Sequence, residues 1–419
     1  MVTFGCRVNQ ADSFGLERQL RAAGGAMVAP ESADVVIVNS CSVTANADQG
    51  TRQTIRRVAR MNPTAQIVAT GCYASRAAAE VAALPGVVAV IPNTDKEKLV
   101  QRLTASIEPT TAVRFAGGDG ACGEMIAPGD GNRTAYTLRV QTGCDESCAY
   151  CIIPSTRGRG RSLPLAKIME DVGLAVDAGY RELQLTGVHL GSYGRDLAPA
   201  SSLPKLLHAL DRHPADVLVR MSSLEPMDCT PEVVDLITTS RRFAPHFHLP
   251  LQHASDVMLQ RMRRPYTRQS YERVVASIRD RLPHAAIGSD LVVGFPGESD
   301  ADASTMLKFL RQSPLTHLHV FPYSDRPGTE ASMMSDKVSG KVIRDRARVV
   351  REIGAGLSSR FFASQVGSIR PGLTLKSSEN IALTDNYLRV HLPGVTADNQ
   401  RVNVRILTAS KTLTGELVA

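Results

Sequence analysis

Six short apolar runs in the middle of the chain restrict its possible folds more than any other feature. They read AYTLRV, ELQLTG, VLVRMSS, HFHLPLQ, AIGSDLVVGF and LTHLHVF, and they lie between residues 135 and 321. Helical patterns at about 164–178, 202–213, 231–240, 267–282 and 299–312 separate them. Strands that alternate with helices predict a parallel sheet. Six such units predict a partial (β/α)6 barrel, which is two units short of a complete one.

The segments on either side of this barrel predict two further domains in an α/β protein. Apolar runs at 2–4, 35–38, 66–70 and 87–91 alternate with helical stretches, so residues 1–107 are expected to form a small parallel α/β sheet. Residues 108–133 are rich in Gly and Pro and predict a linker. The barrel domain is expected over 134–362. Residues 363–419 alternate apolar and polar side chains between turns, which predicts a small antiparallel β-barrel.

Composition narrows the class of protein and its compartment. The 419 residues are 43% hydrophobic and 21% charged, as expected for a globular chain. We see no N-terminal apolar segment and no run of 18 apolar residues, so we expect a cytoplasmic protein without a membrane partner. Disulfides are rare in that compartment, where clustered cysteines more often hold metal. The net charge of +7 and the pI near 9.0 favour an anionic partner.

Three cysteines stand close together directly after the first strand of the predicted barrel. Cys144, Cys148 and Cys151 have the spacing C-x3-C-x2-C, and no fourth cysteine follows nearby. Three thiolates can bind three irons of a cubane cluster and leave the fourth iron open, whereas a structural zinc site needs four ligands. A zinc site completed by a distant histidine is the alternative. The loop is expected at the carboxyl end of the barrel, where such folds place their chemistry.

Three more cysteines each follow a strand of the N-terminal sheet. Cys6, Cys41 and Cys72 come two or three residues after the runs VTF, VVIV and QIVAT. Because the carboxyl ends of parallel strands meet at one edge, these thiols are expected to converge and to bind a second metal centre. The alternative is that they are buried small side chains, as free cysteines often are. Cys122 and Cys229 fit neither set and are interpreted as incidental.

The motif C-x3-C-x-Y-C resembles the signature of the radical S-adenosylmethionine (SAM) enzymes. The segments LTGVHLG, MSSLEP, HLPLQH and SDLVVGFPGE follow in the order expected of that family. The resemblance implies that Cys144, Cys148 and Cys151 hold a catalytic 4Fe–4S cluster whose open iron binds SAM. It also implies a set of cofactor-binding residues: Tyr150, Gly187, Ser222, Ser223, Glu225, Gln252 and Gly294.

A narrower resemblance covers nearly the whole chain. The motifs TFGCRVNQADS, VNSCSVT and TGCYA are similar to the N-terminal domain of the methylthiotransferases, and ALTDNYLRVHL resembles their TRAM domain. This implies that Cys6, Cys41 and Cys72 hold a second 4Fe–4S cluster. FGCRVNQ, GVHLGSYG and RMRRPYT are similar to the threonylcarbamoyladenosine branch, whose reaction places a methylthio group on that nucleoside beside the tRNA anticodon. The implied partners are the tRNA anticodon stem-loop and an electron donor of the flavodoxin or ferredoxin type.

Three other functions remain as alternatives. Two are neighbouring branches of the family, which act on isopentenyladenosine of tRNA or on an aspartate of a ribosomal protein. The third is a non-enzymatic electron carrier with two clusters. A carrier, however, has no need of a six-stranded barrel with polar residues at its strand ends.

Arginines near the cysteine loop and in RMRRPYTR suggest an RNA-binding surface. Guanidinium groups suit phosphates, and the tail barrel suits looped RNA. The alternative is that the arginines form ordinary solvated faces. The predicted RNA-binding residues are Arg157, Arg159, Arg161, Arg263, Arg264 and Arg268.

Overall fold

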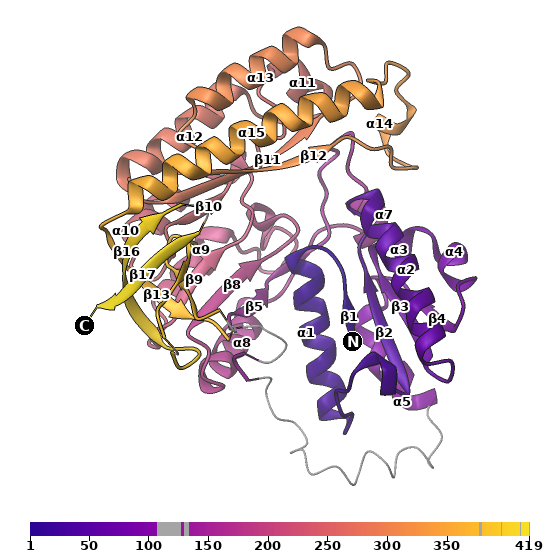
Figure 1. The fold of residues 1–419 in the computed structure, drawn as a ribbon. Coiled ribbons are helices and arrows are strands. Elements are labelled where there is room, and N and C mark those ends of the chain that lie inside the picture. The colour runs from indigo at the N-terminus through magenta and orange to yellow at the C-terminus, as the bar shows by residue number, and fades with distance from the viewer. Residues whose placement is uncertain (107–126, 130–133, 377–378, 395, 411, 419) are drawn as a thin grey trace. The chain divides into compact units, whose positions relative to one another are not determined.

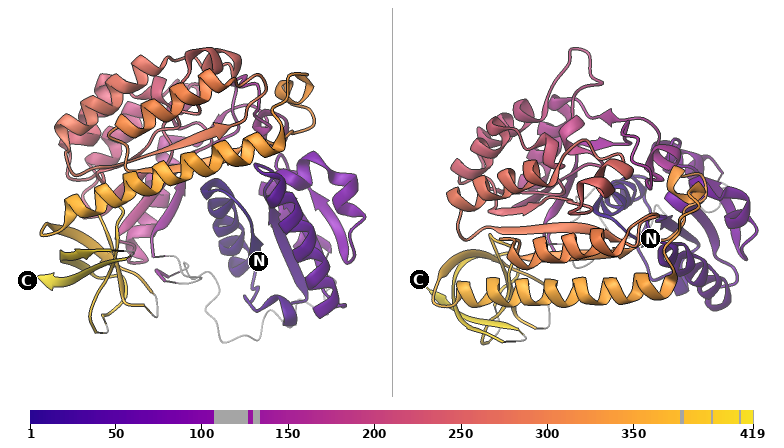
Figure 2. Two further views of the ribbon diagram at one scale, coloured as in Figure 1. Left: turned by 45° about the horizontal axis from the view of Figure 1, so that its top comes forward. Right: turned by 90° about the horizontal axis from the view of Figure 1, so that it is seen from above.

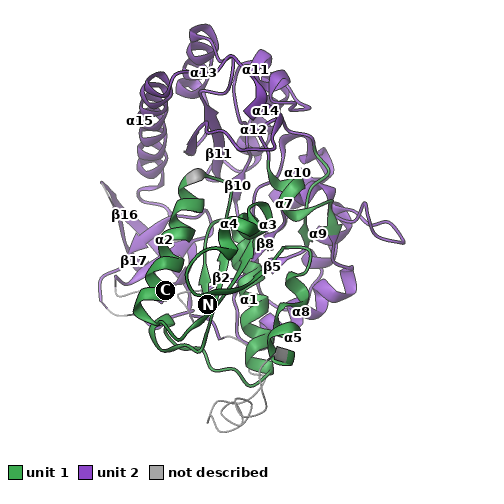
Figure 3. Ribbon diagram, turned by 90° about the vertical axis from the view of Figure 1, so that its right-hand side faces the viewer, with its two compact units in different colours: residues 1–126, 141–146, 152–161 green, residues 127–140, 147–151, 162–419 purple. Residues whose placement is uncertain are grey.

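The computed structural model describes residues 1–106, 127–129, 134–376, 379–394, 396–410 and 412–418 (Figures 1 and 2). Most of the predicted linker, Cys122 included, lies outside these ranges. Contacts divide the chain into two compact units, coloured separately in Figure 3. The first unit comprises 1–126, 141–146 and 152–161, and the second comprises 127–140, 147–151 and 162–419. Among the helices that are described, none is long and apolar enough to cross a membrane.

The first unit contains a parallel sheet whose strand order follows the sequence, β1-β2-β3-β4. The predicted parallel α/β sheet is therefore confirmed. Its strands are β1 (Val2–Thr3), β2 (Val35–Ser40), β3 (Gln66–Gly71) and β4 (Val87–Ile91). Its helices are α1 (Arg7–Ala22), α2 (Ala45–Met61), α3 (Cys72–Arg76), α4 (Ala78–Ala82), α5 (Leu99–Ser106) and α7 (Ile153–Arg157).

Side chains on both faces of this sheet are buried. Val36 and Val38 of β2 pack in one apolar cluster with Ile55 of α2. Ile37, which points to the opposite face, packs in a second cluster with Leu16 of α1 and Leu99 of α5. Two covered faces explain why the strands read as continuous apolar runs. They also leave the strand ends as the places where polar or metal-binding residues can stand.

The second unit contains the six predicted parallel strands. They form two three-stranded sheets, β5-β8-β9 and β10-β11-β12, and isolated bridges join Val219 to Phe243 and Ser223 to His248. The strands are β5 (Tyr136–Arg139), β8 (Glu182–Thr186), β9 (Leu218–Met221), β10 (His246–His248), β11 (Ala286–Val293) and β12 (His317–Pro322). The helices between them are α8 (Leu165–Asp177), α9 (Leu203–Asp211), α10 (Pro231–Thr239), α11 (Asp256–Arg261), α12 (Arg268–Arg281) and α13 (Asp300–Gln312). All five predicted helical segments are thus helices.

Helix α15 (Gly340–Gln365) connects the last strand to the tail barrel, shown in yellow in Figure 2. The tail is a closed barrel in the order β13-β14-β15-β17-β16. Its strands are β13 (Ile369–Thr374), β14 (Ile381–Thr384), β15 (Arg389–His391), β16 (Arg401–Ala409) and β17 (Leu413–Val418). The predicted barrel is confirmed, but it is mixed rather than wholly antiparallel, because β15 pairs with β17 in parallel. The segment ALTDNYLRVHL forms two paired strands with a turn between them.

Arg220 fastens the tail to the six-stranded part of the second unit. Its side chain on β9 is fully buried and forms two hydrogen bonds of 2.8 and 2.9 Å with the carboxylate of Glu182 on β8. Its guanidinium also donates to the backbone oxygen of Asp385, at 2.8 Å, and lies 5.0 Å from the centre of the Tyr387 ring. A buried ion pair of this kind costs much when one partner is removed, since the other charge then stays buried without compensation.

We therefore expect Arg220→Ala to lower the free energy of unfolding of the second unit by about 3–5 kcal/mol. Urea denaturation followed by circular dichroism measures the change. Arg405→Ala is the matched control, because its ion pair with Glu416 is nearly half exposed, and it should cost less than about 1 kcal/mol. Equal urea midpoints for the two variants would show that the buried pair does not hold the tail.

Candidate metal and cofactor sites

Cys6, Cys41 and Cys72 converge at the carboxyl edge of the sheet in the first unit. They follow β1, β2 and β3, and all three thiols are free. A Cβ atom on Gly5 would lie 2.3 Å from the sulfur of Cys41, so the chain next to Cys6 passes directly over that thiol. Burial, with smaller contributions from the charges of Cys6 and Cys72, raises the pKa of Cys41 to about 11. The structure thus brings together the three thiols that the sequence places on separate strands.

Asn93 lies next to these three thiols. Its side-chain nitrogen lies 3.6 Å from the sulfur of Cys72 and donates a hydrogen bond of 2.9 Å to the backbone oxygen of Thr156. Three convergent thiols, a soft donor set that suits iron–sulfur clusters, fit a second cluster at this edge. That these cysteines hold one remains a prediction.

Cys144 follows the short strand β6 (Gln141–Thr142), and the glycine between them is required by the local geometry. Gly143 has φ +72°, and a Cβ there would lie 2.0 Å from the backbone oxygen of Arg159. This close approach lets the Cys144 N–H donate to the oxygen of Gly158, at 3.1 Å. The Cys144 sulfur accepts a hydrogen bond of 3.4 Å from the N–H of Glu146. A sulfur that accepts from backbone N–H groups is suited to carry thiolate charge.

Cys148 and Cys151 are held by the second unit. The Cys151 N–H donates to the backbone oxygen of Cys148, at 3.0 Å. Between them, Ala149 donates to the oxygen of Met262 and accepts from the N–H of Ala331, at 3.1 and 2.8 Å. The loop is therefore fixed by backbone hydrogen bonds, and both thiols are half-buried and not in a disulfide. This arrangement suits thiolate ligands of a cluster that is reached from outside.

Arg264, one of the predicted RNA-binding residues, lies beside Cys148. One guanidinium nitrogen lies 3.0 Å from the Cys148 sulfur, and another forms an ion pair with Glu225. Its Nε also donates to the hydroxyl of Tyr266, at 3.1 Å. Only 3% of the Arg264 side chain is exposed. In this structure the guanidinium is occupied by protein partners, and its RNA contact stays a prediction.

The polar residues predicted to bind the cofactor stand at the carboxyl ends of the strands. Ser222, Ser223 and Glu225 follow β9, Gly187 follows β8, and Gln252 follows β10. The hydroxyl of Ser222 is buried and has no hydrogen-bond partner among the described residues. Buried hydroxyl groups are normally satisfied, so a ligand group is the expected partner. The residues present therefore fit SAM, although their contacts with it remain predictions.

Gln252 is held in a left-handed conformation beside strand β11. Its φ is +65°, its N–H donates to the backbone oxygen of Asp290 at 2.9 Å, and its oxygen accepts from the N–H of Val292 at 2.8 Å. Left-handed backbone is uncommon for residues other than glycine and is often found at ligand sites. The geometry favours the predicted cofactor role of Gln252.

Gly294 and Tyr150 have packing partners that the sequence did not predict. A Cβ on Gly294 would lie 2.3 Å from Ile343 of α15, so this side of the glycine is filled by a side chain. A ligand contact with the backbone of Gly294 on its other side stays a prediction. The ring of Tyr150 packs edge-on against Phe295, with centroids 6.4 Å apart, inside an apolar cluster. A cofactor contact of Tyr150 remains a prediction.

Arg157 is a second buried arginine among the predicted RNA-binding residues, and its RNA contact stays a prediction. Its side chain is only 2% exposed and lies within the first unit, 3.0 Å from the carboxylate of Asp12 and 3.1 Å from the hydroxyl of Thr142. Asp12 also pairs with Lys96, at 2.9 Å. Arg157 thus belongs to a buried ionic network that fixes α7 against α1.

The other four arginines are exposed. Arg159 is 92% exposed and pairs with Asp145, and Arg263 is about half exposed and pairs with Glu330. Arg268 lies 3.6 Å from Glu272, and Arg161 is exposed as well. Surface pairs of this kind are weak and can be exchanged for phosphate contacts. Their RNA-binding role stays a prediction.

Comparison with known proteins now identifies the family. Residues 1–92 match the model described as uncharacterized protein family UPF0004, and residues 138–310 match that of the radical SAM superfamily. The threonylcarbamoyladenosine tRNA methylthiotransferase of Aquifex aeolicus is 36% identical over 410 residues, which cover 96% of this chain and 98% of the relative. The chain belongs to the radical SAM methylthiotransferases. Membership makes the protein an enzyme that uses SAM and a 4Fe–4S cluster.

Two further comparisons place this methylthiotransferase among its relatives. The tRNA-2-methylthio-N(6)-dimethylallyladenosine synthase of Methylobacillus flagellatus is 32% identical over 437 residues, covering 99% of this chain and 98% of the relative. Among solved structures, the radical SAM methyltransferase TsrM of Kitasatospora setae with cobalamin and a 4Fe–4S cluster matches with a TM-score of 0.55. It is 17% identical, and the match covers 72% of this chain and 66% of TsrM. That likeness shows the fold alone.

Sequence reasoning missed a polar group on the strands β10, β11 and β12 of this methylthiotransferase. His248, Asp290 and His319 meet there, with their ligand-type atoms all within 4.8 Å of one another. The signal was present, because HFH and HLH place histidines on one face of a strand and SDLVVGF carries a charge inside an apolar run.

Proposed function

We propose that this methylthiotransferase acts on threonylcarbamoyladenosine beside the tRNA anticodon and replaces the hydrogen on C2 of its adenine by a methylthio group. The observation that carries the proposal is the 36% identity over nearly the full length of both chains to an enzyme of that name. The relative named for the dimethylallyl nucleoside is 32% identical. The partner is then the anticodon stem-loop, and the electron is supplied by a flavodoxin- or ferredoxin-type protein.

The two sets of three thiols receive separate tasks in this proposal. Cys144, Cys148 and Cys151 would hold the catalytic 4Fe–4S cluster, which supplies the electron that cleaves SAM. Cys6, Cys41 and Cys72 would hold a second cluster, which the family resemblance implies. The hydroxyl of Ser222 would bind SAM, and Gln252, fixed by two backbone hydrogen bonds to β11, would orient it.

Nucleoside mass spectrometry of tRNA tests the substrate. A strain that lacks the gene should accumulate unmodified threonylcarbamoyladenosine, and the methylthio derivative should return when the gene is restored. A gene carrying Cys148→Ala is the matched control and should not restore it. Loss of the methylthio derivative of isopentenyladenosine instead would assign the chain to that branch. Intact tRNA nucleosides together with a ribosomal protein lacking its methylthio group would assign it to the protein-acting branch.

Arg264 should set the reduction potential of the catalytic cluster. A cationic N–H donor 3.0 Å from the Cys148 sulfur stabilises the more negative, reduced state. We expect Arg264→Gln to lower the midpoint potential by several tens of millivolts, where about 59 mV corresponds to a tenfold change in a one-electron equilibrium.

A redox titration followed by electron paramagnetic resonance measures this potential. It is best done in a Cys6, Cys41 and Cys72 to alanine background, so that one cluster is observed. Arg263→Gln is the control, because its guanidinium is about half exposed and pairs with Glu330. An unchanged potential in Arg264→Gln would show that the contact with Cys148 has no electrostatic role.

A further inference from the structure

Four histidines line one face of the strands β10 and β12 in the second unit. His246 and His248 alternate with the buried Phe247, and His317 and His319 alternate with Leu318. Leu318 packs outward, because a Cβ on Gly354 of α15 would lie 3.2 Å from it. Residues two apart on a strand share a face, so the histidines point away from α15. We call this face of β10, β11 and β12 the inner face.

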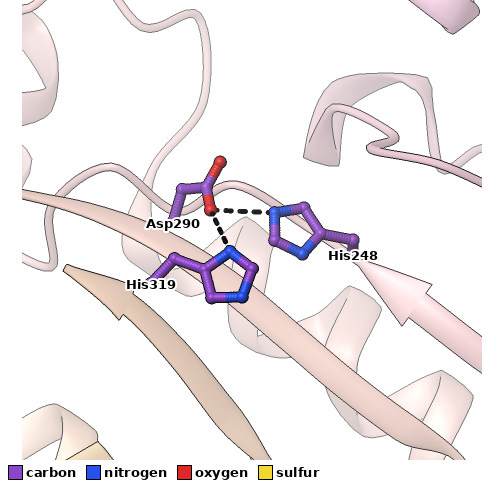
Figure 4. A group of neighbouring side chains, drawn as sticks. All are labelled: His248, Asp290 and His319. Carbon is purple, nitrogen blue, oxygen red and sulfur yellow. Dashed lines mark hydrogen bonds and ion pairs between the residues drawn. The ribbon is translucent and has the colours of Figure 1, made fainter. Parts of the chain in front are cut away.

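Asp290 of β11 connects two of these histidines. Its Oδ1 lies 2.9 Å from Nε2 of His248 and 3.3 Å from Nδ1 of His319 (Figure 4). We call these three residues the His–Asp–His group. Asp290 Oδ2 points away from both rings in Figure 4, and among the described residues no side chain or backbone group bonds to it. Hydrogen bonds from the two imidazoles outweigh the effect of burial and hold the pKa of Asp290 well below its usual range.

The solvent exposure of the His–Asp–His group increases from His248 to His319. The exposed fraction of the side chain is 11% for His248, 24% for Asp290 and 55% for His319. On the other side, the ring of His246 lies 4.4 Å from the ring of Tyr387 in the tail, centre to centre. The inner face is therefore covered by the tail near His246 and accessible near His319.

The His–Asp–His group adjoins the residues proposed to bind SAM. His248 forms a backbone bridge with Ser223, and the backbone oxygen of Asp290 accepts the N–H of Gln252. When the reacting carbon of a substrate faces SAM, a substituent on that substrate could thus reach the His–Asp–His group. The position is that of a substrate site, since it lies next to the cofactor and on the accessible part of the inner face.

We infer that the His–Asp–His group binds the amino-acid arm on N6 of the modified adenosine, a ureido-linked group with a free carboxylate and a hydroxyl. This inference rests on the proposed function. His319, whose Nδ1 lies 3.3 Å from Asp290, donates from its other ring nitrogen to the carboxylate of the arm. Asp290 Oδ2 accepts from the hydroxyl or a ureido N–H. Each polar group of the arm then meets a complementary protein group, as polar groups removed from water require.

The polar residues of the inner face would favour this arm over an isopentenyl group. An isopentenyl chain has no hydrogen-bonding atom, and placing it here would take water from Asp290 and the imidazoles without replacement. A divalent transition metal is the other ligand that two imidazoles and one carboxylate can bind. That outcome is included in the test.

The test crosses a change in the enzyme with a change in the substrate. The substrates are anticodon stem-loop RNAs with threonylcarbamoyladenosine as the free acid and as its methyl ester, which has no negative charge. The enzymes are the wild-type holoenzyme, His319→Phe and His319→Gln, and His208→Phe on the outer helix α9 as the control. Because the His319 side chain is 55% exposed, its replacement should leave the fold intact. Formation of 5′-deoxyadenosine without RNA checks that each variant retains its cluster and its cofactor site.

We expect the wild-type enzyme and His208→Phe to lose about tenfold or more in kcat/KM from acid to ester, mainly through KM. For both His319 variants, kcat/KM on the acid should already be lower than that of the wild-type enzyme by a similar factor. Their kcat/KM on the ester should be nearly the same as on the acid. If the His319 variants keep the wild-type ratio of acid to ester, the inference is wrong although the proposed function stands. If wild-type enzyme modifies only isopentenyl RNA, the proposed function itself has failed. Stoichiometric zinc or manganese that is present in the wild-type holoenzyme and missing from His319→Phe would make the group a metal site instead.

Discussion

Replacing Cys144, Cys148 and Cys151 together by alanine should remove roughly half of the bound iron and all reductive cleavage of SAM. The spacing C-x3-C-x2-C would provide three thiolates to the cluster, and the methionine part of SAM would supply the remaining ligand. In the structure Cys148 and Cys151 sit on a loop held by backbone hydrogen bonds to Met262 and Ala331. Because these bonds do not involve the thiols, the loop should keep its course when the sulfur atoms are removed.

The measurements are iron content after reconstitution and the amount of 5′-deoxyadenosine formed with SAM and dithionite. Cys229→Ala is the control, because this buried thiol donates to the backbone oxygen of Glu225, at 3.5 Å, and belongs to neither set of cysteines, so the variant should retain both iron and cleavage. Continued formation of 5′-deoxyadenosine by the triple variant would show that the catalytic cluster lies elsewhere. If the protein were a non-enzymatic electron carrier, even the wild-type protein would form no 5′-deoxyadenosine.

The strands of this protein could be predicted from its sequence because burial leaves a local pattern. Apolar runs such as VVIV and AIGSDLVVGF are buried on both faces, and that alone separates them from the helices around them. The partners of a strand are not encoded in the same way. The parallel pairing of β15 with β17 depends on how the closed tail barrel returns on itself, which alternation within a strand does not reveal.

The burial of charged residues was the part of the site that could not be predicted. Arg157 and Arg159 are two positions apart, yet the first is buried against Asp12 and the second is 92% exposed. The partner of Arg157 is 145 residues away in the sequence, and Cys148 is 116 residues from Arg264. A buried charge needs a compensating partner, and for these two arginines that partner is distant in the sequence. Local composition therefore cannot distinguish a structural arginine from one that is available to bind RNA.

Replacing Cys6, Cys41 and Cys72 together by alanine should have the complementary effect, leaving the cleavage of SAM intact while abolishing the methylthio product. These thiols converge at the sheet edge of the first unit, separate in sequence from the loop of Cys144, so we expect their loss to remove a different cluster. Alanine fits the buried positions of Cys41 and Cys72 without adding a polar group. Circular dichroism should show an unchanged fold.

The two triple variants serve as controls for each other. Each should retain roughly half of the iron, but only the Cys6, Cys41 and Cys72 variant should form 5′-deoxyadenosine. With threonylcarbamoyladenosine RNA this variant should consume SAM without inserting sulfur, because the radical is generated but no sulfur is held for transfer. Methylthio product from it would contradict a sulfur-delivering role for the N-terminal thiols. If this variant lost both SAM cleavage and the methylthio product, the two sets of cysteines would not act independently.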